Sequence, residues 1–391
     1  MHAKRFNSGT PLSAHTRRWT NQLRSLATSG LLLLLVACGG GKGADEQTAA
    51  QSPAAVRADV LSISTNPRLT PYPPTAAALS AALAEAVDLA YNAGARGQQI
   101  NFSWGALEPS AGNYDAAKLA EISAALDRAA RLSLTQYVGL QPINTLYRDV
   151  PTDLVGRAFD DPLVKQRFRA LLDRVVGAHV GRIQYLAIGN EVDIYLGAHP
   201  EEVAAYTSFF RDAANYARTL DVKIKVGVTG TADGVLGARV GLLANLNNAG
   251  ADVVMLTYYP IRFDALGAVT VRDPSVVGSE VSRLLTFAGS RPLVFQEAGF
   301  PSSPLNLSSE AMQSTFFREL FVAVRAADGR IPYVNVFLLH DLRTQTCDEL
   351  AAFYQFADST SFRAYLCSLG LLQSNGQAKS SWQTLKTESR I

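Results

Sequence analysis

Two glutamates stand where short apolar runs of the sequence stop. Glu191 follows the Leu-Ala-Ile-Gly-Asn run at residues 186–190, and Glu297 follows Leu-Val-Phe-Gln at residues 293–296. Continuous apolar runs of this length are typical of parallel strands buried on both faces. A lone carboxylate at a strand end is more often solvated or salt-bridged than catalytic. Two of them could supply the acid/base and the nucleophile that cleavage of a glycosidic bond requires.

The elements that must position these glutamates alternate regularly between strand and helix. Helical spacing of apolar residues, as at positions 164, 168, 171 and 175, separates the runs, and Asp161-Pro162 predicts a capped helix start. Eight such alternations predict an α/β fold, a single (β/α)8 barrel, rather than a doubly wound sheet. No Gly-rich phosphate loop supports the nucleotide-binding form of the latter. The expected strands are residues 60–64, 99–104, 135–140, 183–191, 222–229, 252–259, 292–297 and 333–340.

The spacing of the two glutamates fits this barrel. They are 106 residues apart, which is three strand–helix units of about 35 residues each. This places Glu191 on strand four and Glu297 on strand seven, both at the carboxyl-terminal rim where barrel active sites lie. Alternation of side chains along strand four predicts that Ala187, Gly189 and Glu191 face the barrel centre.

Residues 1–37 have the pattern of an export signal. Five basic residues precede or flank the apolar run at residues 31–35, which is too short to span a bilayer, and small residues follow it. Leu35-Val36-Ala37-Cys38 resembles the bacterial lipobox, which implies acylation of Cys38 and a lipid anchor in the cell envelope. Gly39 and Gly40 resemble the sequence of lipoproteins sent to the outer membrane. Ordinary signal cleavage or an uncleaved anchor are the alternatives.

The composition of the remaining chain divides it into two segments and limits the classes of molecule that it can bind. Residues 38–55 are polar and small and predict a flexible tether, whereas residues 56–391 predict the barrel. Because residues 1–37 hold five of the 36 Lys and Arg and none of the 34 Asp and Glu, the rest has a net charge near −3. No basic stripe is left to bind nucleic acid. We expect a monomer whose partners are a membrane, through the anchor, and a carbohydrate.

Cysteines and histidines predict a disulfide and no metal centre or cofactor. Besides Cys38, the chain has only Cys347 and Cys367, which in an exported protein we expect to be bonded; two free buried thiols are the alternative. The five histidines are scattered, without metal-ligand spacing.

Four motifs carry a resemblance to clan A retaining glycoside hydrolases. Asn190-Glu191 and Glu297 resemble the acid/base and nucleophile segments of that clan. Residues 257–260, Thr-Tyr-Tyr-Pro, resemble the strand-six segment of endo-galactanases and β-1,3-glucanases, and residues 297–302 are similar to the β-1,3-glucanase nucleophile segment. The segment from Trp104 to Asp115 resembles a loop after strand two in several of its families. The resemblance covers the barrel as a clan rather than one family.

The resemblance implies a role for each residue. Glu191, protonated at rest, would be the acid/base and Glu297, ionised, the nucleophile, so the pKa of one should rise while that of the other stays low. Asn190 would hold a sugar hydroxyl, with capping of the next turn as the alternative. Tyr259 would hydrogen-bond Glu297. The implied activity is double-displacement hydrolysis of a β-linked poly- or oligosaccharide.

Four further side chains are weaker candidates for substrate contact. Trp104 could stack on a sugar or pack in the core, and Tyr258 suits packing better than chemistry. His340 and Asp341 could line the site or form a rim salt bridge. Glu108, beside Pro109 in a turn-rich loop, is expected to tie down backbone amides.

The sequence departs from the clan at two places. Asn101 and Ser103 stand where many members carry an Arg at the end of strand two, and Leu338-Leu339-His340-Asp341 stands where many carry a Trp after strand eight. These departures motivate a second hypothesis, a surface lipoprotein that binds glycan without cleaving it. Two intact carboxylates argue against it, since a binder gains nothing from burying an ionisable pair.

Overall fold

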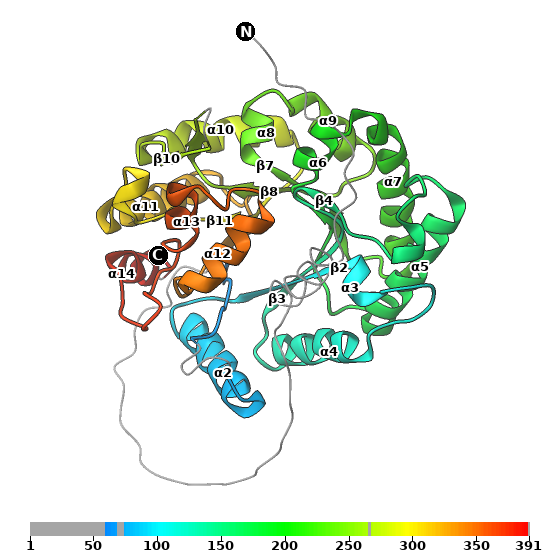
Figure 1. Cartoon of the computed structure of the whole chain (residues 1–391), viewed down its shortest axis with the longest axis horizontal. Helices are drawn as coiled ribbons and strands as arrows, with labels where there is room; N and C mark the ends of the chain where they lie inside the picture. Colours follow the sequence, from blue (N-terminus) through cyan, green and yellow to red (C-terminus); the bar gives the residue numbers. More distant parts are fainter. Residues whose placement is uncertain (1–58, 69–73, 265–266, 390–391) are drawn as a thin grey trace.

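The computed structural model describes residues 59–68, 74–264 and 267–389, which form a barrel of parallel strands surrounded by helices (Figure 1). The sheet order is β6-β5-β3-β2-β1-β12-β11-β8-β7, and its neighbours pair in parallel. The strands are β1 (Val60–Ile63), β2 (Gly97–Ser103), β3 (Thr135–Asn144), β5 (Tyr185–Asn190), β6 (Lys225–Gly227), β7 (Thr229–Thr231), β8 (Val254–Tyr258), β11 (Leu293–Ala298) and β12 (Tyr333–Val336). This confirms the predicted (β/α)8 fold.

The barrel closes through its fifth strand. The two ends of the sheet, β6 and β7, are separated in the chain only by Val228. β6 pairs with β5 and β7 pairs with β8, so the strand expected at residues 222–229 is broken but spans the seam. Counting β6 and β7 together gives the eight strands of the prediction.

Helices cover the outside of the barrel (Figure 1). They bury the apolar stripes that the sequence predicts: in α5, Val164, Phe168, Leu171 and Val175 are all buried. Asp161 caps this helix by accepting a hydrogen bond from the amide of Leu163 (2.8 Å), as predicted. The helices are α2 (Ala76–Asn92), α4 (Ala116–Arg131), α5 (Pro162–Val175), α7 (Val203–Leu220), α9 (Val240–Asn248), α10 (Val277–Ala288), α11 (Glu310–Ala326) and α14 (Ser380–Glu388).

Side chains fill the barrel interior. Tyr137 and Tyr333 stack with ring centroids 5.9 Å apart, and Ala187, Met255 and Val294 complete the same buried cluster. The predicted inward orientation of Ala187 is therefore confirmed. The interior is a packed core, and any ligand must bind at the rim.

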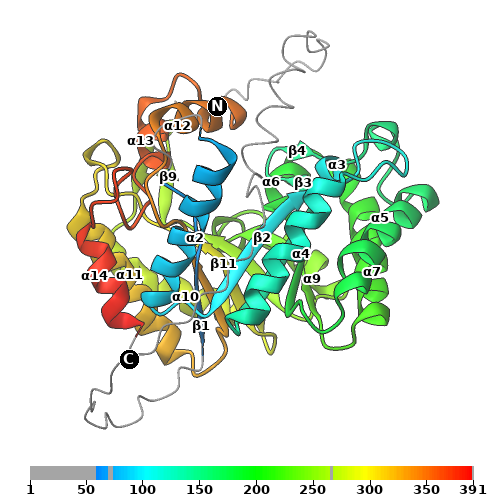
Figure 2. The same cartoon turned by 90° about the horizontal axis from the view of Figure 1, so that it is seen from below.

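Short elements build up the end of the barrel where the strands terminate. Figure 2 shows α3, α6, β4, α12 and α13 at this end of the molecule. They are α3 (Trp104–Leu107), β4 (Tyr147–Arg148), α6 (Val192–Ala198), α8 (Ala232–Leu236), the hairpin of β9 (Ile261–Phe263) and β10 (Val269–Val271), α12 (Thr344–Phe353) and α13 (Thr360–Leu366), with 3-10 turns at Thr152–Leu154, Pro200–Glu202, Pro274–Val276 and Pro304–Asn306. A further 3-10 turn, Gly177–His179, follows α5 at the opposite end of the barrel. Within the described ranges, no helix combines the length and apolar character needed to cross a bilayer.

Most strands end within one or two residues of the predicted position, but β3 and β12 differ more. β3 continues to Asn144, past the expected end at residue 140, because β4 pairs with its last residues in an antiparallel hairpin. β12 ends at Val336 rather than residue 340, since its neighbour β11 stops at Ala298, whose carbonyl accepts the amide of Phe337 (2.9 Å). Both changes alter the rim around the two glutamates.

Candidate active site

The two candidate carboxylates lie at the same rim of the barrel. Glu191 directly follows β5 and begins α6, and Glu297 is the last residue but one of β11. Parallel strands bring their carboxyl ends to one face, so both residues lie at the end that carries α6 and α12 (Figure 2). Both side chains are partly buried.

Glu191 is held in an uncommon backbone conformation. Its φ of 45° lies in the left-handed region, and so does the φ of 49° at Thr145, the residue after β3. The amide of Thr145 donates to the carbonyl of Asn190 (2.9 Å), which ties the two strand ends together. Left-handed residues other than glycine cost free energy and concentrate at functional sites. The strain here is located at Glu191 and at a residue that contacts it.

Two threonine hydroxyls orient the Glu191 carboxylate. Thr145 Oγ1 donates to Oε2 (2.9 Å) and Thr257 Oγ1 donates to Oε1 (2.7 Å). Thr257 is also the register partner of Glu297 in the β8–β11 pair. The carboxylate of Glu191 therefore reaches the residue that pairs with Glu297 across the two strands.

Glu297 has its own pair of donors. The hydroxyl of Tyr259 donates to Oε2 (2.6 Å), and Nε2 of Gln296 donates to Oε1 (3.1 Å). The predicted contact between Tyr259 and Glu297 is present. A shift of register between Phe295 and Glu297 marks an irregularity in β11 at this point. Such an irregularity re-aims the side chains that follow it.

Burial raises the pKa of both carboxyl groups. For Glu297, burial and then the nearby charge of Glu191 raise the pKa to about 7, against the lowering effect of its two donors. For Glu191, burial raises the pKa, the two threonine hydroxyls lower it, Asp193 raises it and Arg239 lowers it. The prediction that one of the two pKa values stays low is wrong, because both groups are desolvated. The pair therefore tends to keep a proton near neutral pH.

A buried ion pair anchors the helix that follows Glu191. Asp193 is fully buried, and its carboxylate accepts hydrogen bonds from the amide and hydroxyl of Thr231 (2.9 and 2.8 Å). Arg239 Nε donates to the same carboxylate (2.7 Å). These contacts join the first turn of α6 to the end of β7, which fixes the backbone next to Glu191.

Asn190 presents an unused acceptor to the site. Its Nδ2 donates to Oδ1 of Asn144 (3.2 Å) and, more weakly, to Thr145 Oγ1 (3.4 Å). Its Oδ1 is buried and has no hydrogen-bond partner. Buried polar atoms are normally satisfied. The amide is thus suited to receive a hydroxyl of a bound molecule.

Three aromatic residues near the pair were not predicted. Tyr354 directly follows α12, and its hydroxyl interacts with Thr145. Burial raises the pKa of Tyr354, and the charges of both glutamates raise it further. Tyr365 of α13 packs edge-on against Tyr259 (5.9 Å), and its pKa is raised by burial first and then by Glu191. Phe337, partly exposed, also packs edge-on against Tyr259 (6.2 Å). No motif marks them, because they follow strand eight in a segment without repeat spacing.

Trp104 and Tyr258 do not line the site, and the predicted substrate contacts are wrong for both. Trp104 is fully buried between Phe168 and Phe209. Tyr258 is fully buried on the outer face of β8, where its hydroxyl donates to Glu280 (2.9 Å). The neighbouring Tyr259 faces the site instead.

The loop after β2 owes its shape to Glu108, as predicted. Its carboxylate accepts hydrogen bonds from the Trp104 indole (2.9 Å) and from the amide of Gly112 (3.0 Å), and it pairs with Arg167 (2.7 Å). The residue is fully buried. It therefore explains the burial of Trp104, whose polar edge needs a partner in the core.

His340 and Asp341 are engaged in structural contacts. His340 is 4% exposed and its Nδ1 lies 2.9 Å from the carbonyl of Asn66. Asp341 forms a salt bridge with Lys379 (2.7 Å) and accepts the amide of Gly370 (2.8 Å). For Asp341 the predicted alternative, a rim salt bridge, is present. These contacts tie the end of strand eight to the segment that leads into α14.

The predicted disulfide is present between Cys347 and Cys367. It joins the first turn of α12 to the end of α13. Cys38, the predicted signal at residues 1–37 and the tether at residues 38–55 lie outside the described residues.

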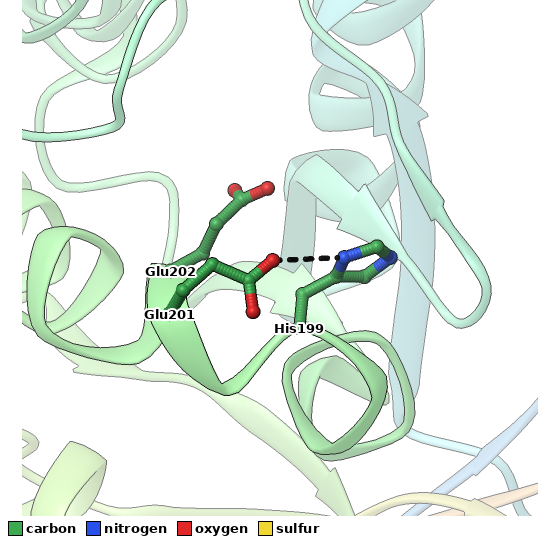
Figure 3. A group of neighbouring side chains, drawn as sticks. All are labelled: His199, Glu201 and Glu202. Carbon is green, nitrogen blue, oxygen red and sulfur yellow. Dashed lines mark hydrogen bonds and ion pairs between the residues drawn. The ribbon is translucent and has the colours of Figure 1, made fainter. Parts of the chain in front are cut away.

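One group of potential metal ligands occurs in the described part of the chain. His199, Glu201 and Glu202 lie close together after α6 (Figure 3). Glu201 points at the His199 ring, with 3.3 Å between Oε1 and Nδ1. The carboxylate of Glu202 already accepts the hydroxyl of Tyr195 (2.8 Å) and pairs with Arg148 (3.4 Å). Internal partners thus account for this cluster without an ion.

The sequence matches no protein-family model and no curated protein. Several solved structures share the fold. A GH5_18 from Bifidobacterium longum subsp. infantis superposes with a TM-score of 0.63 at 16% identity, over 85% of this chain and 78% of that one. The exo-beta-1,4-mannosidase Op5Man5 from Opitutaceae bacterium strain TAV5 gives 0.62 at 16%, over 88% and 62%.

A third similar structure contains a sugar. It is a GH5_18 variant from Streptomyces cattleya in complex with Manb1-4GlcNAc, with a TM-score of 0.61 at 17% identity. The match covers 78% of this chain and 75% of that one. At these identities the likeness concerns the fold. It agrees with the predicted (β/α)8 barrel.

Proposed function

We propose that the protein is a retaining β-glycoside hydrolase that uses Glu191 as acid/base and Glu297 as nucleophile. The observation that carries the proposal is that Thr257, the register partner of Glu297, binds the Glu191 carboxylate, so that two carboxylates, each held by two hydrogen-bond donors, lie close enough for the charge of Glu191 to act on Glu297. Such a pair at the carboxyl-terminal rim of a barrel suits double displacement.

In the proposed reaction, protonated Glu191 donates its proton to the glycosidic oxygen as the bond to the anomeric carbon breaks. Ionised Glu297 attacks that carbon and forms a glycosyl ester. Glu191, now ionised, takes a proton from water, whose oxygen attacks the same carbon and releases Glu297. The two attacks give net retention at the anomeric centre.

Other residues of the site have supporting roles in this proposal. Asn190 would accept a sugar hydroxyl at its unpartnered Oδ1. Tyr259 would hold Glu297 in line and stabilise its charge. Phe337 would offer an apolar surface to the sugar ring. β-Mannosides are the first substrates to test, because an exo-β-1,4-mannosidase and a Manb1-4GlcNAc complex are among the similar structures.

The test is turnover by residues 41–391 on aryl β-glycosides and on β-mannan, β-glucan, β-galactan and xylan oligosaccharides. Glu297→Gln should abolish hydrolysis, and Glu191→Gln should lower it by about 10²–10⁴-fold with poor leaving groups and less with good ones. Glu201→Gln is the matched control at the same rim and should leave activity unchanged. Sugar binding without hydrolysis by the wild type would favour the glycan-binding alternative.

We also propose that the protein is exported and anchored in the bacterial envelope through an acylated Cys38. The lipobox-like Leu35-Val36-Ala37-Cys38 and the basic, apolar segment before it support this. Expression of the full chain and of Cys38→Ser, followed by fractionation and mass spectrometry of the N-terminus, tests it. An unmodified Cys38 in the membrane fraction would exclude the lipid anchor.

A further inference from the structure

The segment after strand eight forms a cap with its own small core. We use "cap" for α12, α13 and the residues between them, 344–366. Its apolar residues cluster with the β9–β10 hairpin, separately from the main cores of the barrel. Phe263 of the hairpin stacks on Phe356 (5.5 Å), and Ser361 accepts the amide of Val269 (2.9 Å). With the Cys347–Cys367 disulfide, these contacts make the cap a fixed part of the rim.

The cap reaches the loop after strand three. The hydroxyl of Tyr147, in β4, donates to the carbonyl of Phe353 (3.0 Å) and accepts a hydrogen bond from Gln355 (3.2 Å). The rings of Tyr147 and Phe353 lie 4.9 Å apart. We call this contact between β4 and the end of α12 the Tyr147 bridge.

The strand order gives the position of the Tyr147 bridge. Around the barrel, β3 and β12 are separated by β2 and β1 on one side and by β5, β6/β7, β8 and β11 on the other. Glu191 and Glu297 follow β5 and β11, on the second side. A bridge from the end of β3 to the segment after β12 therefore crosses the rim between the glutamates and the ends of β1 and β2.

The cap also contacts the surroundings of both carboxylates. Tyr354, next to the Tyr147 bridge, interacts with Thr145, which binds Glu191. Tyr365 packs on Tyr259, which binds Glu297. The cap thus lies one residue away from each reacting group. We call the cap and the Tyr147 bridge together the barrier.

We propose that the cap and the Tyr147 bridge close one end of the site and restrict the enzyme to chain ends of its β-linked substrate. This rests on the proposed function and specifies how that site selects its substrate. Cleavage inside a polysaccharide requires the chain to pass the two carboxylates in both directions. Here bonded residues block one direction, so the substrate can enter the site only by its end.

The decisive experiment is a time course on a β-linked hexasaccharide labelled at its reducing end, analysed at early turnover. The proposal expects stepwise loss of one or two sugars from one end, with mono- or disaccharide as the first product. Early labelled fragments from cuts at several internal bonds would overturn this proposal and leave the proposed function standing. No turnover of any substrate would overturn both.

Variants test whether the barrier causes the end selectivity. Tyr147→Ala removes the ring and hydroxyl contacts, and Cys347→Ser/Cys367→Ser removes the covalent tie. We expect internal cuts to increase at least several-fold relative to terminal ones in either variant. Tyr216→Ala, which loses a similar surface contact to Asp173 far from the rim, is the control and should keep the wild-type pattern. An unchanged pattern in both rim variants, with folding shown by circular dichroism, would overturn the barrier as the cause.

Discussion

The hydrogen bond from Tyr259 to Glu297 gives a quantitative prediction for Tyr259→Phe. The substitution keeps the ring, which packs against Phe337 and Tyr365, and removes only the hydroxyl 2.6 Å from the carboxylate. A hydrogen bond to a charged group contributes about 1.5–3 kcal/mol. Because one pKa unit corresponds to about 1.4 kcal/mol, losing it should raise the pKa of Glu297 by about 1–2 units.

The sign of the effect on activity follows from the proposed role. Glu297 attacks only when ionised, and its pKa in the wild type is already raised to about 7. A further rise moves the acid limb of the kcat/KM profile upward by about 1–2 pH units. At pH 7 the ionised fraction, and with it kcat/KM, should fall by about 5- to 50-fold.

The assay is kcat/KM for an aryl β-glycoside between pH 4 and 9, which reports the ionisation of the free enzyme. Tyr258→Phe is a matched control: Tyr258 is the last residue of β8, directly before Tyr259, and it also donates to a carboxylate, Glu280, but on the outer face. It should leave the acid limb in place. An acid limb that does not move in Tyr259→Phe, or that moves downward, would refute the reasoning.

Three further predictions concern stability. Glu297→Gln should stabilise the fold at high pH. The folded pKa of about 7 exceeds the ordinary 4.5, so the wild type's cost of burying the charge grows between these pH values to on the order of 3 kcal/mol. Urea unfolding at about pH 4 and pH 8 should show the gain at the higher pH and almost none at the lower. Trp104→Phe leaves buried Glu108 without its indole donor and should lower the free energy of unfolding by about 1–3 kcal/mol. KM should not change, and an altered KM would show that Trp104 does contact substrate. Cys347→Ser/Cys367→Ser opens a loop between residues 20 positions apart and should cost about 3 kcal/mol, and a reductant should then have no further effect on Tm.

The barrel and the carboxylate pair could be predicted because both depend on regular patterns. Buried parallel strands need apolar runs at regular intervals, and a carboxylate at the end of such a run stands out. Tyr259 was found through its motif. The threonines were not, because a Thr at a strand end is common; only the β8–β11 register shows that Thr257 stands beside Glu297 and can reach Glu191.

The sequence-based predictions are wrong where a shift of one position along the chain decides which way a side chain faces. Tyr258 and Tyr259 are adjacent in the chain, yet one lies in the outer core and the other binds Glu297. Trp104 is buried in the core between the barrel and its helices because α3 begins at that residue and Glu108 accepts the hydrogen bond of its indole N–H. The cap has no repeat spacing at all, so Tyr354 and Tyr365 could be placed only by the structure.

The donors around the two carboxylates favour the proposed division of roles even though burial raises both pKa values. Glu191 is bound by two threonine hydroxyls, and a hydroxyl can both donate and accept. These contacts can therefore be kept whether Glu191 carries a proton or not, as an acid/base that alternates between the two states requires. One donor to Glu297 is the Gln296 amide nitrogen, which can only donate. The other is Tyr259, whose pKa is raised well above its ordinary value by burial first and then by Glu297, so it keeps its proton. Protonation of Glu297 would turn the Tyr259 contact around, with Tyr259 as acceptor, whereas the ionised form accepts from both donors in charge-assisted hydrogen bonds, which are the stronger kind. The two donors therefore favour the ionised form that a nucleophile needs.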